Sequence, residues 1–354
     1  MKKMKKAMSA ILAAAMVMSM GMTAMADEKP LATKAATYST DAALLKKAYA
    51  VAGATTVGEK EKAGYVDGTK IYPNETLKFE SVADTNNPDK GVLNLTIADL
   101  VVKGNADQKI SISVPSYSVA GTYHYTISET AGDKAGVTYS KETLKISVLV
   151  TYDYKDSDND GYRMTATVGV TQPEKGNKDF EFNNTYDLGS LDVKKSVTGN
   201  LGDKNKEFDV YVTFTSSNAI ASDITYVDSN EIKTITAADV NSDGATVKIT
   251  LKDAETVKFY NIPAGVTYSV KESDEYSKDT NKNGVNGYDA PTYTYGNETK
   301  TIAKDKTDEV NVINKKETGV DTGISLDNMP YFMVLAMVAL GLVGFVSKKR
   351  SNEF

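Results

Sequence analysis

Two strand-like runs place polar side chains where a β-strand points into a core. The runs are Phe180 to Tyr186 and Leu191 to Val197, joined by a short turn. Successive side chains of a strand point to opposite faces, so Asn184 shares the inward face of the aromatic residues in the first run. Lys195 shares the inward face of the apolar residues in the second. A buried lysine or asparagine without a partner costs several kcal/mol, so each needs a polar partner in the same core.

The pattern occurs twice along the chain. Each half carries a lysine, then a glutamate, then an asparagine, each in phase with neighbouring apolar residues. The two sets are Lys47, Glu129 and Asn184 in the first half and Lys195, Glu272 and Asn314 in the second. Two alternatives stay open. The segment ALLKKAYAV around Lys47 also fits one turn of helix, and a one-residue slip in register would turn Lys46 or Lys194 inward instead.

The chain between its two ends is predicted to be all-β. Short runs rich in Val, Ile, Thr and Tyr alternate with clusters of Gly, Asp, Asn or Pro, as in a β-sandwich. Examples are VLNLTIADLVV, KISISV, TYHYTISE, LKISVLVTYDY and YRMTATVGV. A helical period is indicated only over residues 220–232, as a short helix. The pattern starts over after residues 187–190, so we expect two domains, residues 27–187 and 188–316.

The N-terminal residues predict export. Residues 1–26 begin with lysines, continue with an apolar stretch and end in Ala24-Met25-Ala26, a small-x-small cleavage site, so we expect a signal peptide. An uncleaved membrane anchor is the alternative. The chain contains no cysteine, so an exported protein of this sequence has to be stabilised by something other than a disulfide.

The C-terminal residues 317–354 predict a membrane segment. Residues 329–347 are almost wholly apolar and just long enough to span a bilayer, and Lys348, Lys349 and Arg350 follow at once. Basic residues stay on the inner side of a membrane. We therefore expect the two domains to lie outside the cell, held at their C-terminal end.

The repeated set of side chains has the chemistry to form an amide. Desolvation disfavours the charged form of a buried lysine and favours the protonated form of a buried glutamate. The neutral amine is a nucleophile, and a protonated carboxyl can polarise the carboxamide of a nearby asparagine. Attack on that carboxamide expels ammonia and leaves a Lys–Asn bond, with the glutamate as proton shuttle. Packing holds the groups together, so no separate enzyme is required.

Other functional classes have less support. A net charge of −6, with lysines scattered among acids, argues against nucleic-acid binding. A secreted hydrolase is disfavoured because the only histidine, His124, alternates outward and no cluster of a nucleophile with its base is visible. The loops DSDNDG and DTNKNG begin like calcium loops but have Thr167 and Ala290 where the acid at the twelfth position belongs. We expect no metal and no cofactor.

Around these sets the chain resembles the pilin isopeptide-linkage domains of Gram-positive major pilins, above all the streptococcal T-antigen type. The similar parts are the ending FEFNNTY, the opening LDVKKSV with the following TGNLGDKNKEFDVYVTF, and the segment PNETLKF. The resemblance implies two tandem immunoglobulin-like β-sandwiches of the collagen-adhesin B type. It also implies bonds between the first and last strands, from Lys47 to Asn184 with Glu129 and from Lys195 to Asn314 with Glu272.

The same resemblance implies attachment by a sortase, which cleaves between the threonine and glycine of an LPxTG-like pentapeptide. Here GVDTG keeps Thr322 and Gly323 but has Gly and Val in place of Leu and Pro, and residues 318–319 form a second Thr-Gly candidate. In the family the acceptor lysine precedes the closing strand of the first domain. In this chain that position points to Lys178 first and Lys175 second.

Together these inferences predict a structural protein rather than an enzyme. We expect a subunit of a cell-surface pilus that crosslinks itself, is joined by sortase to other copies of itself, and is anchored in the cell wall after a transient stay in the membrane. Peptidoglycan or minor pilins would be its other partners. The alternative is a monomeric wall-anchored adhesin for a host ligand that the sequence does not identify. It would have the same fold and anchor and would differ in not polymerising.

Overall fold

The structure, a computed structural model, describes most of the chain between its two ends. The described residues are 37–38, 45–52, 71–103, 107–153, 163–171, 181–228, 231–278 and 287–317. Several predicted features lie outside them: the signal peptide, the two calcium-like loops, Lys175, Lys178, and residues 318–354 with Thr322 and Gly323.

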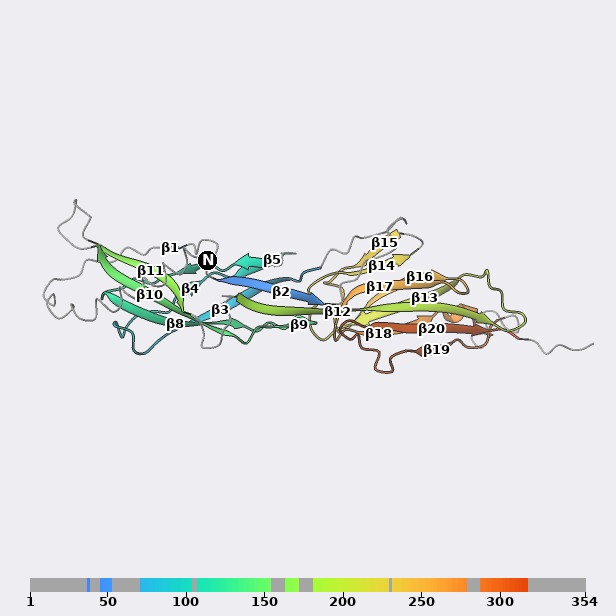
Figure 1. The fold of residues 1–354 in the computed structure, drawn as a ribbon. Coiled ribbons are helices and arrows are strands. Elements are labelled where there is room, and N and C mark those ends of the chain that lie inside the picture. The colour runs from blue at the N-terminus through green and yellow to red at the C-terminus, as the bar shows by residue number, and fades with distance from the viewer. Residues whose placement is uncertain are drawn as a thin grey trace, which may run out of the picture.

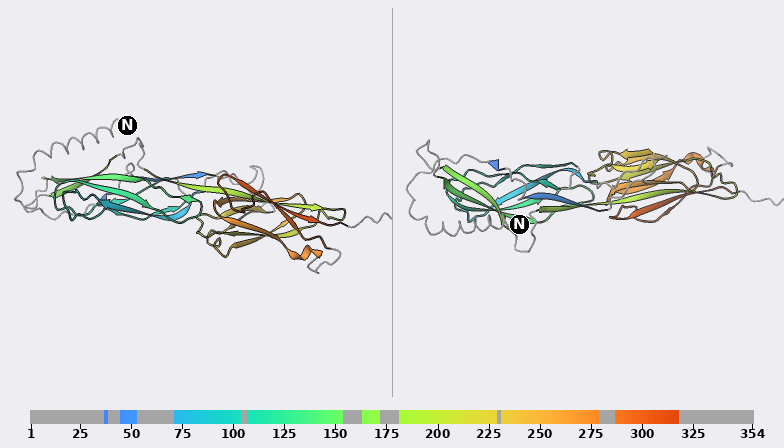
Figure 2. Two further views of the ribbon diagram at one scale, coloured as in Figure 1. Left: turned by 90° about the horizontal axis from the view of Figure 1, so that it is seen from below. Right: turned by 45° about the horizontal axis from the view of Figure 1, so that its top comes forward.

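Two β-sandwiches lie end to end and give the described part of the chain an elongated shape (Figure 1). The two further views show the same arrangement (Figure 2). Among the described residues the regular structure is β, apart from one short 3-10 helix, η2 (Asp274–Tyr276). The predicted all-β class with two domains is confirmed.

The first sandwich is built from the strands of the N-terminal half. Their bounds are β1 (Thr37–Tyr38), β2 (Lys46–Ala52), β3 (Asn74–Ala83), β4 (Thr96–Ile97), β5 (Leu100–Lys103), β6 (Asp107–Lys109), β7 (Ile112–Ser113), β8 (Gly121–Thr130), β9 (Val137–Thr138), β10 (Thr143–Asp153) and β11 (Arg163–Thr171). One sheet has the order β11-β10-β8-β3-β5. The other contains β2, β6 and β9 beside the first half of β12 (Glu181–Thr198), and β1, β7 and β4 form a small third sheet.

The second sandwich continues from β12. Its other strands are β13 (Phe208–Thr215), β14 (Ile224–Asp228), β15 (Glu231–Ile235), β16 (Ala245–Leu251), β17 (Thr256–Pro263), β18 (Thr267–Glu272), β19 (Thr292–Tyr295) and β20 (Thr307–Lys315). One sheet runs β15-β14-β17-β12 and continues through β20 to β19, and the other has the order β16-β13-β18. Phe214 and Phe259 pack edge to face between them, with ring centres 5.2 Å apart.

Strand β12 belongs to both sandwiches and changes its inward face between them. Its even-numbered residues from 182 to 188 are buried in the first sandwich, and its odd-numbered residues from 191 to 197 in the second. The change coincides with an irregularity in the pairing with β17 between Gly189 and Leu191. A Cβ at Gly189 would lie 2.5 Å from the carbonyl oxygen of Ala303, so the close approach there requires glycine.

The two sandwiches pack against each other around β12. Buried apolar and aromatic side chains from both fill the junction: Tyr49, Leu77, Tyr139, Tyr186, Leu188 and Ala221. Hydrogen bonds also cross it. The hydroxyls of Tyr186 and Ser222 lie 2.7 Å apart, and the backbone N–H of Asn74 donates to the carbonyl of Ala221 at 2.8 Å. The shared strand is therefore held in place by both domains.

Two local predictions are decided by the structure. The short helix predicted over residues 220–232 is wrong, because the antiparallel strands β14 and β15 lie there. Ile220 and Ile224 have the spacing of a helix face, but burial along β14 alternates, with Ile224 and Tyr226 inward. The segment around Lys47 is strand β2 rather than a turn of helix.

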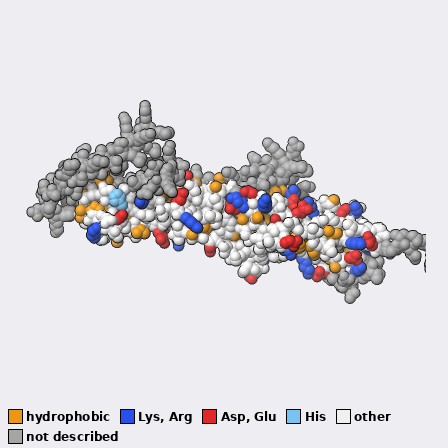
Figure 3. Space-filling view, turned by 60° about the horizontal axis from the view of Figure 1, so that its bottom comes forward, with side chains coloured by type: hydrophobic (Ala, Val, Ile, Leu, Met, Phe, Trp, Pro, Cys, Tyr) orange, Lys and Arg blue, Asp and Glu red, His pale blue; other side chains and the backbone are white. Residues whose placement is uncertain are grey.

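The described surface carries mixed charge. Acidic and basic side chains are interspersed on the face drawn in Figure 3. His124 is exposed, as its alternation with buried tyrosines predicted. Over the residues that the structure describes, no helix has the length and apolar character to cross a membrane, and no group of three or more His, Cys, Asp and Glu side chains is placed to hold a metal ion.

Candidate functional site: two buried lysine–glutamate–asparagine clusters

The same strand geometry positions lysine and asparagine in both sandwiches. Strand β2 runs parallel to β12, with Lys47 opposite Phe182 and Asn184 two residues further along. Strand β12 in turn runs parallel to β20, and Lys195 and Asn314 have the same offset of two residues. Each lysine is therefore a diagonal neighbour of its asparagine on one inward face of the sheet.

The glutamate of each cluster comes from the opposite sheet. Glu129 lies near the end of β8, and Glu272 is the last residue of β18. Both are in phase with buried residues of their strands, Glu129 with Ile127 and Glu272 with Val270. Since side chains two apart on a strand share a face, each glutamate reaches the lysine and asparagine across the core of its sandwich.

In the first cluster, Glu129 bridges the other two side chains. Lys47 Nζ lies 2.7 Å from Glu129 Oε2, and Asn184 Nδ2 donates to Glu129 Oε1 at 2.7 Å. Asn184 Oδ1 accepts a hydrogen bond from the backbone N–H of Ser140 at 2.8 Å. Asn184 Nδ2 also lies 3.4 Å from the hydroxyl of Tyr49. The side chains of Lys47 and Glu129 are 1% and 0% exposed, so the cluster is closed to solvent.

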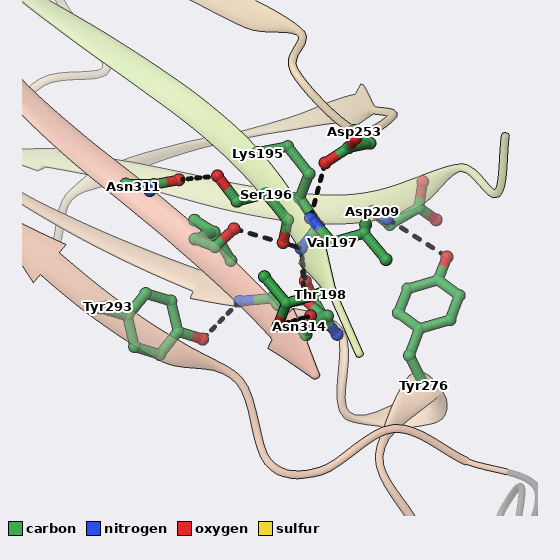
Figure 4. A network of polar contacts seen from close by, with 12 residues as sticks. Lys195, Ser196, Val197, Thr198, Asp209, Asp253, Tyr276, Tyr293, Asn311 and Asn314 are labelled. Carbon is green, nitrogen blue, oxygen red and sulfur yellow. Dashed lines mark hydrogen bonds and ion pairs between the residues drawn. The ribbon is translucent and has the colours of Figure 1, made fainter. Parts of the chain in front are cut away.

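In the second cluster, Glu272 makes the corresponding bridge. Figure 4 shows Lys195 and Asn314 on the neighbouring strands β12 and β20. Asn314 Nδ2 donates to Glu272 Oε1 at 2.6 Å, and Lys195 Nζ lies 3.3 Å from Glu272 Oε2. Lys195 also donates directly to Asn314 Oδ1. Its Nζ lies 4.4 Å from the ring centre of Phe208. The hydroxyl of Tyr293 accepts the backbone N–H of Glu272 at 2.9 Å, which fixes the end of β18 beside the cluster.

Burial shifts Lys47, Lys195 and Glu272 toward their neutral forms. Desolvation lowers the pKa of Lys47 and of Lys195, although the hydrogen bonds and charges of the two glutamates oppose the shift. Desolvation likewise raises the pKa of Glu272, against the attraction of Lys195. In the second cluster the pKa values of amine and carboxyl therefore move toward each other, which favours transfer of a proton from ammonium to carboxylate. The neutral amine that results is the form able to attack a carbonyl carbon.

The structure brings all six residues of the two predicted sets into their clusters, and it adds contributors that the sequence did not reveal. These are the backbone N–H of Ser140, the hydroxyl of Tyr49 and the hydroxyl of Tyr293. Tyr49 is in phase with Lys47, so the sequence marks it as a core residue. Nothing in the pattern marks its hydroxyl as a neighbour of Asn184, and a backbone N–H leaves no signature in the sequence at all.

Comparison with known proteins finds a family match on each sandwich. Residues 56–187 match the model described as "Spy0128-like isopeptide containing domain", and residues 189–316 match one described as "Domain of unknown function (DUF7601)". The chain is 28% identical over 308 residues to a "Pilin" of Streptococcus pyogenes serotype M1, across 81% of this chain and 88% of the relative.

Two further likenesses are more limited. The chain is 31% identical over 137 residues to the "Pilus tip adhesin Cpa" of Streptococcus pyogenes, across 39% of this chain and 18% of that protein. Among solved structures, the major pilin T-13 from Streptococcus pyogenes serotype GAS131465 aligns with a TM-score of 0.49 and 19% identity, over 77% of this chain and 96% of that one.

The first sandwich thus matches the family of Spy0128-like isopeptide-containing domains. The chain is thus similar over most of its length to a streptococcal pilin, and this similarity identifies it as a structural subunit of a pilus rather than an enzyme. The resemblance that the sequence shows around FEFNNTY and LDVKKSV is confirmed.

Proposed function

We propose that each cluster forms an intramolecular isopeptide bond, Lys47 to Asn184 and Lys195 to Asn314. The observation that carries the proposal is the repeated geometry. In each sandwich a buried lysine and asparagine with the same strand offset are bridged by a glutamate from the opposite sheet. A buried ion pair is weak evidence for stability, because desolvation offsets its attraction. Conversion of the lysine into a neutral amide removes that cost.

The reaction that we propose is balanced within each cluster. The neutral Nζ of the lysine attacks Cγ of the asparagine, and the electron pair of the C=O bond moves to Oδ1. The protonated glutamate gives its proton to Nδ2 and takes one from Nζ, so it ends as it began. The Cγ–Nδ2 bond then breaks, ammonia leaves and the C=O bond re-forms. Enclosure of the groups in one core replaces a bimolecular encounter, so the fold itself supplies the catalysis.

The positions of the bonds suit a pilus subunit under tension, in which the Lys195–Asn314 bond would lie on the path of the load. Each would join the first and last strands of an immunoglobulin-like sandwich of the collagen-adhesin B type, and the two sandwiches share β12. A covalent link between adjacent parallel strands passes tension directly from one to the other. The strands that lie between the two bonded strands along the chain then bear no tension. This property suits a filament that is only one subunit wide.

For assembly we propose that the pilin is exported through residues 1–26 and held transiently by residues 329–347. A sortase then cleaves between Thr322 and Gly323 and joins the Thr322 carbonyl to Lys178, or else Lys175, of another copy. The same chemistry would link the polymer to peptidoglycan or to minor pilins in the cell wall. The order of export signal, Thr-Gly, apolar span and basic tail supports this route, together with the similarity to a pilin across most of both chains.

One experiment tests the bonds residue by residue. After proteolysis of the folded protein, mass spectrometry should detect a branched peptide containing Lys47 and Asn184 and another containing Lys195 and Asn314. Glu129→Gln should remove the first and Glu272→Gln the second. Glu309→Gln, at a side chain 49% exposed, is the matched control and should leave both. Unbranched peptides at both sites of the natural sequence would contradict the proposal.

A second experiment tests assembly. Boiled cell-wall extract of cells that carry the cognate sortase should give a ladder of covalent oligomers on a blot, and Lys178→Ala combined with Lys175→Ala should reduce it to wall-attached monomer. The competing function is a monomeric adhesin, for which the partial match to a protein named as a pilus tip adhesin is the supporting observation. A single monomeric band from the natural sequence would favour that function.

A further inference from the structure

The carbonyl oxygen of Asn184 has a fixed hydrogen-bond donor that does not take part in the proton shuttle. The backbone N–H of Ser140 donates to Asn184 Oδ1 at 2.8 Å. Both residues are buried, Asn184 at 0% exposure and Ser140 at 9%. Glu129, by contrast, contacts the Nδ2 side of the same carboxamide. The two ends of the reacting amide are therefore held by two different groups.

The fold fixes the position of this N–H from both sides. Strand β9 pairs with β12, with Thr138 opposite Thr185, so the chain that leaves β9 runs directly past Asn184. Tyr139, just before Ser140, donates through its hydroxyl to Glu75 at 2.6 Å. On the other side, the hydroxyl of Ser140 accepts the backbone N–H of Glu142 at 3.3 Å. The donor is thus part of an ordered segment and needs no rearrangement to reach Oδ1.

Negative charge develops at Oδ1 when the amine attacks. Donors placed 2.7–3.1 Å from the atom that becomes an oxyanion, in a water-excluded site, are among the largest contributors to acyl-transfer catalysis. The Ser140 N–H meets this criterion for distance and for burial. In the second cluster the donor found at Asn314 Oδ1 is the amine of Lys195, the group that has to attack.

We propose that the backbone N–H of Ser140 is the oxyanion donor of the first isopeptide site. The inference rests on the proposed function and adds a catalytic group to it. As the Lys47 Nζ–Asn184 Cγ bond forms, the electron pair displaced onto Oδ1 is stabilised by this N–H. The pair returns to re-form the C=O bond when the Cγ–Nδ2 bond breaks and ammonia leaves. Ser140 neither gains nor loses a proton.

The test replaces the N–H without changing the side chain. Incorporation of the α-hydroxy analogue of serine at position 140 converts the amide N–H to an ester oxygen, and the rate of ammonia loss on refolding is followed by mass spectrometry of the branched peptides. We expect the first bond to form at least about a hundredfold more slowly and the second at its normal rate. Ser140→Ala, which keeps the N–H, is the matched control and should be close to the natural rate.

Further measurements separate catalysis from structure. Hydrogen exchange in β8 and β10 checks that the first sandwich is folded, and the pH at which the rate is half-maximal should stay unchanged, since the N–H does not titrate. If the ester variant fails to fold, Ser140→Pro removes the same N–H by another route. A folded variant without the N–H that reacts at the rate of Ser140→Ala overturns the inference alone. Absence of the Lys47–Asn184 bond from the natural protein overturns the proposed function with it.

Discussion

The two clusters share their core chemistry but differ in the groups that surround the asparagine. Tyr49 stands opposite Asn184 on the neighbouring strand, whereas Val197 stands opposite Asn314. The carbonyl oxygen of Asn184 is held by a backbone N–H, whereas that of Asn314 faces Lys195. What the two sites have in common is the strand offset and the bridging glutamate. We therefore propose that these two features define an isopeptide site, and that the remaining contacts affect only the rate at which the bond forms.

The clusters also differ in their place along the proposed filament. Asn184 and Lys195 lie on the same strand, β12, so that strand takes part in both bonds. If subunits are joined through Lys178 and Thr322, tension enters just before β12 and leaves after β20. It then crosses the Lys195–Asn314 bond but bypasses the Lys47–Asn184 bond. The Lys195–Asn314 bond would then carry the force. The Lys47–Asn184 bond would only stabilise the first sandwich, through which the force does not pass.

The largest expected effect is the extension of the second sandwich under force when its bond is removed. The chain can be pulled between two introduced cysteines, Lys178→Cys and Glu317→Cys, which are unique attachment points because the natural chain has no cysteine. Under this force, Lys195→Ala should allow the second sandwich to extend. Lys195 and Asn314 are 119 residues apart in the sequence, so unfolding of the segment between them would lengthen the chain by roughly 400 Å.

Under the same pulling geometry, Lys47→Ala should add no such step, because the first bond lies off the path. Lys194→Ala, at an exposed neighbour, is the matched control and should not extend either. Single-molecule force spectroscopy measures all three variants. Equal extension of the Lys47 and Lys195 variants would show that the load crosses both domains.

The next effect is thermodynamic and should appear in both domains. A crosslink that closes a loop of about 100 residues stabilises by up to about 4.7 kcal/mol through the entropy of the unfolded chain. Glu272→Gln should therefore lower the free energy of unfolding of the second sandwich by several kcal/mol without affecting that of the first, and Glu129→Gln should do the converse. Denaturant titration with domain-resolved hydrogen exchange measures the loss. A variant that stays as stable as the natural chain would contradict a stabilising bond in that domain.

A smaller effect concerns the pH dependence of bond formation in the second cluster. Burial raises the pKa of Glu272 above 4.5 and lowers that of Lys195 below 10.5. Below the carboxyl pKa, both groups are protonated and no neutral amine is present. Above the amine pKa, both are deprotonated and no proton is available for the leaving ammonia. The reaction therefore requires the state in which Lys195 and Glu272 together hold one titratable proton, on the glutamate carboxyl, with the lysine amine neutral.

The rate of ammonia loss after a refolding jump should therefore be bell-shaped in pH, with limbs that lie inside the range from 4.5 to 10.5. Quenched mass spectrometry of the peptides with Lys195 and Asn314 gives this rate. A rate that keeps rising beyond pH 10.5 would show that the glutamate does not supply the proton.

The smallest effect tests the tyrosine that distinguishes the first site. The Tyr49 hydroxyl lies 3.4 Å from Asn184 Nδ2, which is long for a hydrogen bond, and it donates to Glu75. Tyr49→Phe should slow the first bond only a few-fold, since Glu129 still holds Nδ2. Tyr293→Phe, which removes a hydroxyl near the second cluster, is the counterpart control and should leave the first bond at its normal rate. If Tyr49→Phe slowed formation of the first bond as much as Glu129→Gln does, Tyr49 would be part of the proton shuttle.

Much of the fold and of the clusters is readable from alternation alone. The switch of parity along β12, from Asn184 in phase with aromatic residues to Lys195 in phase with valines, reports a strand that serves two cores. Such a pattern is informative because every side chain of a strand has only two directions to point. For the same reason, inward-pointing polar residues stand out against the apolar background.

The remainder depends on tertiary packing. The four-residue spacing of Ile220 and Ile224 imitates a helix face, but pairing of β14 with β15 and β17 overrides it. The donor at Ser140 arises because β9 pairs with β12, and no property of the serine side chain encodes it. The sequence likewise does not show that Asn184 and Asn314 have different partners at their carbonyl oxygens.

The most direct test of the central claim is the intact mass of the folded mature protein. Each Lys–Asn bond expels one ammonia, so the mass should fall below that of the sequence by about 17 Da per bond, or about 34 Da for both. Glu129→Gln or Glu272→Gln should each restore one ammonia. Two bonds in the natural chain and one in each variant would establish two independent sites. A mass equal to that of the unmodified sequence would contradict the account.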